Sequence, residues 1–480
     1  MLDFNTILFW LLGFSIAFAA AGVAYSRRER LNLEDYIVAR NTQSTVATLL
    51  TLLATSFGAW ILFAPAQAAT WGGLAAVVGY ALGAVAPRVA MIPLGRRMRE
   101  LIPQGHTLTE FVISRYGRPM YALVLLIMLF YLFIALTAEI TAMAKLVALL
   151  APIPLWVTAG IVLGSTLIYT AYGGLKASIF TDQIQMLIIV PLLLILILLG
   201  WHAAGGLDPA MAGLKVRAPQ LLRLDDWGGI KAGLTFFMAI LLTGIFHQGN
   251  WQRVYAARDL RSMRRGFLLG GLFAAPVIFI LGLFGLAFVG LGHDGDSSVA
   301  LFEVLLPQVP VWFLIALIPL GLALVMSSAD TAISAVSSLI AVDLGRIMPR
   351  TSQAAMLKLS RWLILALSLP VLWAASKGYS VLYLFLLADL FCSAAAFPVF
   401  FGMFNRRHSG GIATFSTICG LAGGLLLFPA PGAPPVTLLE SFLVAALVPA
   451  LLCLVWSALS RPGRNFDFDA LAGASRTLRN

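Results

Sequence analysis

The sequence predicts an all-α integral membrane protein with about thirteen transmembrane helices. Of its 480 residues, 60% are hydrophobic and only 11% are charged, and the mean hydropathy is +0.93. A typical soluble domain has roughly 25% charged residues, so this chain has too few charges to cover a water-exposed surface. A helix needs about 20 apolar residues to cross a bilayer, and runs of that length recur along the chain. These observations exclude an ordinary soluble enzyme.

The apolar runs are uniform along their length, which indicates helices, because a backbone in hydrocarbon must satisfy its own hydrogen bonds. A transmembrane barrel would show short segments of alternating polarity instead. In chain order, the predicted helices lie at 4–25, 44–70, 73–95, 119–150, 155–171, 183–204, 229–250, 266–291, 310–342, 355–375, 379–403, 410–429 and 436–459.

The basic residues predict an N-terminus outside and a C-terminus in the cytoplasm, because Lys and Arg accumulate in cytoplasmic loops. Clusters such as Arg96–Arg99 and Arg253–Arg265 then lie inside. The few basic residues left outside are Lys215, Arg217, Arg223, Lys231 and Lys377. The first helix has Asp3 before it and Arg27, Arg28 and Arg30 after it. A signal peptide has the opposite charge order, so we expect a retained helix. The net charge of +11 therefore reflects orientation and does not indicate a nucleic-acid partner.

The loops predict one transmembrane transporter domain over residues 1–480. The outside loops at 205–228 and 292–309 are modest, and the tail after Arg461 is short. An ATP-driven pump needs a phosphate-binding loop or a phosphorylated aspartate in a sizeable cytosolic domain, and these loops are too small for one. We expect no enzymatic activity, no cofactor and a monomer as the functional unit.

Two carboxylates lie near the middle of predicted helices, where a charged side chain is costly and needs a partner or a function. They are Glu139 in the fourth helix and Asp389 in the eleventh. A coupling role and a structural hydrogen bond are equally open for both. Arg88 and Lys145 are nearer to helix ends, and we expect them to extend toward the polar surface.

The ninth helix has a stripe of hydroxyl groups at helical spacing. Its members are Ser327, Ser328, Thr331, Ser334 and Ser338. Such a stripe is often a sign of tight helix packing. Hydroxyl oxygens together with backbone carbonyls also suit an alkali cation, and the neighbouring Asp330 makes this second interpretation at least as favourable.

Two helices contain residues that interrupt a helix. The second has Gly58 and Pro65 seven residues apart, and the seventh ends in the glycine-rich, polar segment Thr243–Arg253. A kink without function is the alternative, but broken helices in corresponding positions are typical of the binding site of an inverted-repeat transporter. For His247, which lies in this segment, we expect a loop hydrogen bond and not a metal or proton role.

In this order, these segments resemble the sodium:solute symporter family, which includes sodium/proline, sodium/glucose and sodium/sialic acid symporters. The resemblance rests on Tyr169–Lys176, Thr181–Gln185, Gln252–Arg253 and Met326–Asp330, and on the layout of thirteen helices. It implies a leucine-transporter-type core of two inverted five-helix repeats. The implied divisions are an extra N-terminal helix at 4–25, the core at 44–403, two C-terminal helices at 410–459 and a cytoplasmic tail at 460–480.

The resemblance also implies a sodium site between the second and ninth helices. Its residues would be Ala54, Phe57, Leu324, Ser327 and Ser328. In some family members a second ion or a coupling role falls at positions that match Asp182, Asp330 and Thr331. Proline symporters have an aspartate where this chain has Ser56, so the number of ions stays open.

The implied function is secondary active symport, in which inward sodium flow drives uptake of a small polar organic solute by alternating access. The candidate substrate-cavity residues are Trp60, Phe63, Gln67, Phe246 and Gln248. The segment 103–117 is similar to a stretch in urea and polyamine symporters of the same family, which favours a urea-like solute, and an amino acid or a similar solute stays open. We expect the protein in a bacterial cytoplasmic (inner) membrane. Proton coupling through Glu139, Asp182 or Asp330 and a transporter-like membrane sensor are the alternatives.

Overall fold

The computed structural model describes residues 2–28, 33–347, 353–460 and 465–473. Arg30 and parts of the predicted tail lie outside these residues. Within them the chain is helical and contains no named strand. Eleven helices are long and apolar enough to cross a membrane, and the two shorter apolar helices are Thr45–Ser56 and Leu155–Thr170. Side chains such as Leu187 and Leu426 are 76% and 86% exposed, as expected for a surface that faces lipid.

The second and third predicted helices correspond to three consecutive helical segments. They comprise α3 (Thr45–Ser56), the short 3-10 helix η1 (Ala59–Leu62) and α4 (Ala64–Leu101). Inside α4, Gly73 has a positive φ of 63°, which separates two helical directions. A Cβ at Gly73 would lie 2.5 Å from the carbonyl oxygen of Leu221, so both the conformation and the packing require glycine.

The predicted division between the helices at 155–171 and 183–204 is present as a kink inside α7 (Leu155–Ala203), but the second helix begins at Gly174 and not at 183, so most of the predicted loop is helical. Only Gly174, with φ of 54°, has non-helical torsion angles there. The polar residues that suggested a loop are instead buried in the protein. Ser178 and Asp182, for example, are 1% and 0% exposed, since they contact polar groups on neighbouring helices.

The predicted interruption of the seventh helix is present. Helix α9 (Trp227–Phe246) ends at the extended residue His247, and α10 (Gln248–Ala256) follows directly. The remaining long helices are α1 (Phe4–Arg28), α6 (Arg118–Leu150), α11 (Leu260–Leu291), α13 (Val311–Ile347), α14 (Gln353–Ala375), α15 (Val381–Phe401), α16 (Gly410–Leu427) and α17 (Leu438–Leu459). The short ones include α2 (Leu33–Ile37), α5 (Leu108–Tyr116), α8 (Leu207–Arg217), α12 (Ala300–Leu305) and α18 (Asp469–Ala472).

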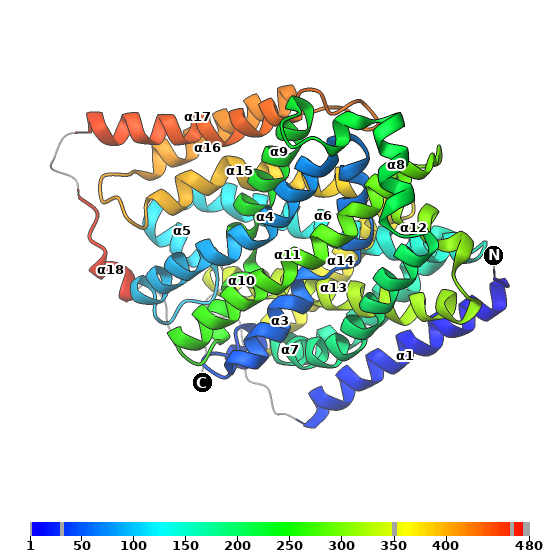
Figure 1. Cartoon of the computed structure of the whole chain (residues 1–480). Helices are drawn as coiled ribbons and strands as arrows, with labels where there is room; N and C mark the ends of the chain where they lie inside the picture. Colours follow the sequence, from blue (N-terminus) through cyan, green and yellow to red (C-terminus); the bar gives the residue numbers. More distant parts are fainter. Residues whose placement is uncertain (1, 29–32, 348–352, 461–464, 474–480) are drawn as a thin grey trace.

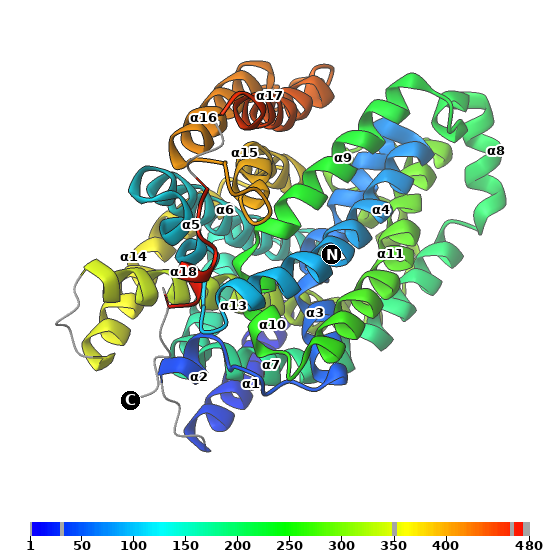
Figure 2. The same cartoon turned by 90° about the vertical axis from the view of Figure 1, so that its left-hand side faces the viewer.

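The long helices pack as two groups with α3 and α10 between them. One group consists of α4, α9 and α11, and the other of α6, α7, α13 and α14. Helix α3 contacts both groups, through α11 on one side and through α7 and α13 on the other, and α10 contacts α13 and α3. Helix α1 lies along one side of the bundle and α16 and α17 lie at the opposite side (Figures 1 and 2). The polar residues of the interruptions are therefore enclosed at the centre.

Candidate functional site

The end of α3 meets the middle of α13 at a buried hydroxyl group. The Oγ of Ser327 lies 3.1 Å from the carbonyl oxygen of Ala54 and 2.9 Å from that of Leu324. Helix α3 ends at Ser56, and the buried Phe57 leaves the helical conformation with φ of −96° and ψ of 67°. Carbonyl oxygens at such an end lack partners within the helix. Three of the predicted ion ligands thus converge, and Phe57 lies in the interruption beside them.

Close approach at Gly58 brings the interruption against α6 and α13. A Cβ there would lie 1.9 Å from Oε1 of Glu139 and 2.6 Å from Oγ of Ser328. Glu139 Oε2 accepts a hydrogen bond of 2.7 Å from the backbone N–H of Ala59, which favours the structural alternative for this carboxylate. The buried Oγ of Ser328 has no hydrogen-bond partner among the described residues. A ligand between α3 and α13 could therefore use this hydroxyl oxygen.

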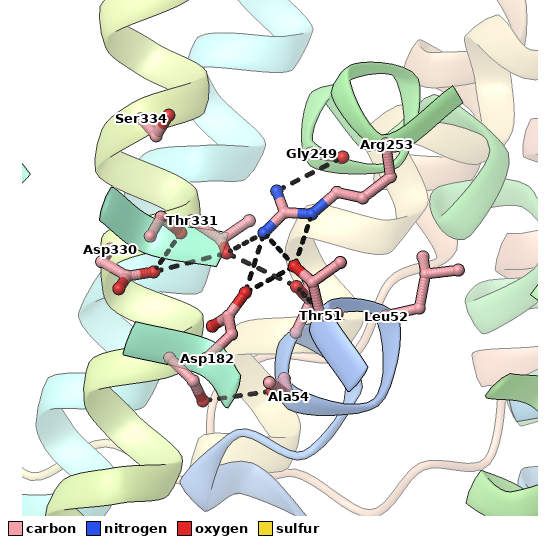
Figure 3. A network of polar contacts seen from close by, with 12 residues as sticks. Thr51, Leu52, Ala54, Asp182, Gly249, Arg253, Asp330, Thr331 and Ser334 are labelled. Carbon is pink, nitrogen blue, oxygen red and sulfur yellow. Dashed lines mark hydrogen bonds and ion pairs between the residues drawn. The ribbon is translucent and has the colours of Figure 1, made fainter. Parts of the chain in front are cut away.

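Arg253 on α10 lies at the centre of a second buried polar network (Figure 3). Its Nη2 is 3.2 Å from Oδ2 of Asp182 on α7, and 3.0 Å from both Oγ1 of Thr51 on α3 and Oγ1 of Thr331 on α13. The side chains of Arg253 and Asp182 are 1% and 0% exposed. Arg253, which we counted with the basic residues of a cytoplasmic loop, lies instead in the buried helix α10, where a buried carboxylate pairs with it.

Asp330 completes this network on the side of α7. Its carboxylate accepts hydrogen bonds from the hydroxyl groups of Tyr169 and Ser178, both at 2.8 Å, and of Thr181 at 3.1 Å. The three residues expected for a second ion or for coupling thus gather around the guanidinium group. Sequence reasoning missed the roles of Thr51 and Arg253, although Gln252–Arg253 was among the segments that carry the resemblance.

A cavity of about 140 Å³ lies beside the end of α3. Trp60, Tyr80, Tyr131 and Phe385 supply aromatic lining, and the charged lining residues are Arg88, Glu139 and Asp389. Ser328 also lines it, so the cavity adjoins the candidate ion ligands. Arg88 hydrogen-bonds to the hydroxyl of Ser56 and the carbonyl of Ala84. Our expectation that Arg88 extends to the surface is therefore wrong.

Of the five candidate substrate residues, only Trp60 lines this cavity. The other four have partners elsewhere, because the rotation of each helix directs their side chains away. Phe63 packs on Phe302, Phe246 packs on Phe400, Gln67 accepts a hydrogen bond from Ser380, and Gln248 bonds to His106 and Leu108. His247 does line the cavity, and its Nδ1 accepts from the N–H of Gly249 at 2.9 Å, in agreement with the expected loop hydrogen bond.

A charged cluster at one end of the bundle joins the stretch that contains α2 to the stretch that begins α5. Its residues are Glu34, Arg40, His106 and Glu110, and we call them the α2–α5 cluster. His106 Nε2 lies 2.8 Å from Glu34 and its Nδ1 lies 3.3 Å from Glu110, while Arg40 pairs with Glu34 at 2.6 Å. Burial opposes charge on His106, but hydrogen bonds that the imidazolium donates to Glu110 and Glu34, together with the negative charges of these carboxylates, outweigh it and raise the pKa of His106 to about 9. Gln248 of α10 donates to the carbonyl of His106 at 3.0 Å, which ties the cluster to the interrupted helix.

Comparison with protein families gives a match between residues 36–420 and the model of the sodium:solute symporter family. The spermidine transporter DUR31 of Candida albicans is 23% identical to this chain, over 82% of this chain and 74% of its own length. The high-affinity proline transporter PutP of Bacillus subtilis is 24% identical, over 83% of this chain and 87% of its own length.

A solved structure described as the substrate-bound outward-open state of a Na+-coupled sialic acid symporter has a TM-score of 0.78 to this chain. The match covers 96% of this chain and 99% of that chain at 17% sequence identity. The inward-facing conformation of Mhp1 matches with a TM-score of 0.56 over 93% of this chain. These likenesses confirm the predicted leucine-transporter-type fold.

Proposed function

The chain belongs to the sodium:solute symporter family and is a sodium-coupled solute symporter, and we propose that its sodium ion binds between α3 and α13. The ligands in this proposal are the carbonyl oxygens of Ala54, Phe57 and Leu324 and the hydroxyl oxygens of Ser327 and Ser328. The observation that carries it is the contact of Ser327 Oγ with the carbonyl oxygens of Ala54 and Leu324. Unwound backbone carbonyls are a recurrent sodium ligand in transporters of inverted-repeat architecture.

We assign a coupling role, and not a second ion, to Asp182, Asp330 and Thr331. Support comes from Arg253, whose guanidinium group already supplies a positive charge to this set. Arg253 belongs to α10, whereas its partners belong to α3, α7 and α13. An ion that draws α3 toward α13 therefore also changes the position of α10, because Arg253 bonds to both helices. A ligand drives a conformational equilibrium only through its different affinity for the two states, and this linkage offers such a difference.

The proposed solute is a small polar organic molecule, such as an amino acid or a urea-like compound, and its site is the cavity beside Trp60. The size of the cavity and its mixture of aromatic, acidic and basic lining support this class. We further propose that the protein has no enzymatic activity, acts as a monomer and lies in a bacterial cytoplasmic membrane. The N-terminus is outside and the C-terminus is in the cytoplasm in this proposal.

The sodium dependence of uptake into proteoliposomes tests the assigned ion site. We expect Ser327→Ala and Ser328→Ala each to raise the sodium concentration for half-maximal uptake about tenfold, which corresponds to about 1.4 kcal/mol of binding free energy. Ser338→Ala is the matched control on the same helix, because its hydroxyl bonds to the carbonyl of Ala335. An unchanged sodium dependence in both variants would contradict the assignment.

The same vesicles separate the alternatives and identify the solute. Uptake that does not depend on sodium but stops when a protonophore is added would indicate proton coupling. A purified protein that transports no solute would support the alternative of a membrane sensor. Candidate amino acids, urea-like compounds and polyamines are first screened by thermal unfolding with and without sodium. A compound that raises the melting temperature only when sodium is present identifies both the transported solute and the coupling ion.

A further inference from the structure

A groove between α7, α13 and α14 has a lining that no part of the transport mechanism uses. Its volume is about 350 Å³, and its apolar wall consists of Leu167, Ile168, Ile333, Ile364 and Leu365. Ile168 is 54% exposed while Ile333 is only 2% exposed, so the groove extends from the bundle surface to the side of α13. A long apolar ligand that lies in the bilayer could enter it sideways.

Helix α14 places two basic residues at one end of this groove, which we call its charged end, while the wall of the groove itself is apolar. Lys358, Arg361, Trp362 and Leu365 all line it, and their spacing of three, four and seven residues places them on one face of the helix. Seven residues of helix span about 10 Å. Lys358 therefore lies at the start of the face, Arg361 and Trp362 lie about one turn further along, and Leu365 lies about one turn beyond them. Trp362 is 60% exposed.

The charged end lies at the end of the bundle that we assign to the cytoplasm. Helix α14 follows α13 after a short connection, and Asp343 near the end of α13 accepts from the hydroxyl of Thr109 in α5 at 3.5 Å. The α2–α5 cluster lies at this same end. From this surface inward, the groove thus has Lys358 first, then Arg361 and Trp362 at one level, and then aliphatic residues. Basic and aromatic residues near the membrane surface and aliphatic residues deeper match the head group and the acyl chain of a lipid in one leaflet.

We propose that this groove is a binding site for an anionic phospholipid of the cytoplasmic leaflet. Its phosphate contacts Lys358 and Arg361, and one acyl chain packs along the apolar wall. Basic groups at a crevice between transmembrane helices recognise anionic head groups in this way. Ile333 extends from a different side of α13 than Ser327 and Ser328, given five or six residues of helical rotation between them. The bound lipid therefore supports the helix that carries the proposed sodium ligands.

Lipid titrations monitored by native mass spectrometry of the purified full-length protein test this site. We expect dioleoyl phosphatidylglycerol to bind at least fivefold more tightly than dioleoyl phosphatidylcholine. The double variant Lys358→Gln/Arg361→Gln removes this preference. Its matched control is Arg264→Gln/Arg265→Gln, which removes two exposed basic residues from the start of α11 and keeps the preference. Equal binding of both lipids by the wild type, or an unchanged preference in the first double variant, overturns the proposal.

Two further binding measurements distinguish a lipid site from a site that binds only an anion. Glycerol 3-phosphate carries the same phosphate chemistry without acyl chains, and we expect it not to displace the bound phosphatidylglycerol. Ile168→Trp fills part of the apolar wall, and we expect it to weaken phosphatidylglycerol binding at least threefold while both basic residues remain. Displacement by glycerol 3-phosphate together with normal lipid binding in Ile168→Trp would overturn the lipid assignment.

Discussion

At the scale of single residues, the interruption after α3 depends on the absence of a side chain at Gly58. The carboxylate of Glu139 and the hydroxyl of Ser328 occupy the space where a Cβ would lie. Glu139 must stay close, because it accepts a hydrogen bond from the N–H of Ala59 at the start of η1. The sequence predicted a break at this glycine, but it did not identify the two side chains that pack against it.

Gly58→Ala therefore tests the packing at the interruption. Overpacking of a filled site costs about 1–3 kcal/mol, and we expect a lower melting temperature and a weaker response of uptake to sodium. Gly160→Ala is the control, because no heavy atom lies within 4 Å of its added Cβ. Equal behaviour of the two variants would mean that the close contacts at Gly58 are unimportant.

The buried pair of Arg253 and Asp182 allows a second prediction at this scale. Removing one member of a buried ion pair leaves an uncompensated charge and costs about 3–5 kcal/mol. We expect Arg253→Gln to unfold at a lower temperature than the wild type, and Arg253→Gln/Asp182→Asn to be more stable than the sum of the single effects allows. Additive losses in a thermal-unfolding cycle of the four proteins would show that the pair is not coupled.

At the scale of elements, His106 of the α2–α5 cluster contacts Glu34 of α2, Glu110 of α5 and Gln248 of α10. Its folded-state pKa of about 9 exceeds the ordinary value of 6.5, so protonation of His106 stabilises this arrangement. The contribution is fully present below pH 6.5 and disappears as the pH rises through 9. The contacts of Gln248 with His106 and Leu108 extend this dependence to α10.

The pH dependence of thermal stability checks this contribution. We expect the melting temperature of the wild type to fall between about pH 6.5 and 9 and that of His106→Gln to change much less over the same range. His202→Gln, at an exposed site outside the cluster, should behave like the wild type. A parallel decrease in wild type and His106→Gln would assign the pH effect to other groups.

At the scale of the whole molecule, the distribution of basic residues implies an orientation that labelling of intact cells can test. On a background without Cys392, Cys419 and Cys453, we expect a membrane-impermeant maleimide to label Lys215→Cys directly. It should label Arg264→Cys only after the membrane is permeabilised. Both positions are exposed, so burial does not affect the comparison. The reverse pattern would invert the proposed topology.

The class of the molecule and its long helices could be predicted from the sequence, because hydrophobic length and charge placement are local properties of the chain. Both interruptions follow from glycine and proline patterns that are visible in sequence, whereas the pairing of α3 with α13 was implied by the resemblance to the symporter family. The break between the fifth and sixth predicted helices is present at Gly174, but the segment 175–182 is helical and was predicted as a loop. Its polar residues look like a loop until the neighbouring Asp330 and Arg253 are known to face them.

What the sequence by itself determined is therefore the membrane class, the positions of most helices and the two interruptions, while the resemblance to the symporter family implied which residues meet at the end of α3. Only the tertiary structure decided which side chains line the central cavity, that Arg253 pairs with Asp182, and that α14 faces a groove with a charged end. The physical reason is that hydropathy and helix breaks act along the chain. The direction of a side chain depends on helix rotation, which contacts between distant segments determine.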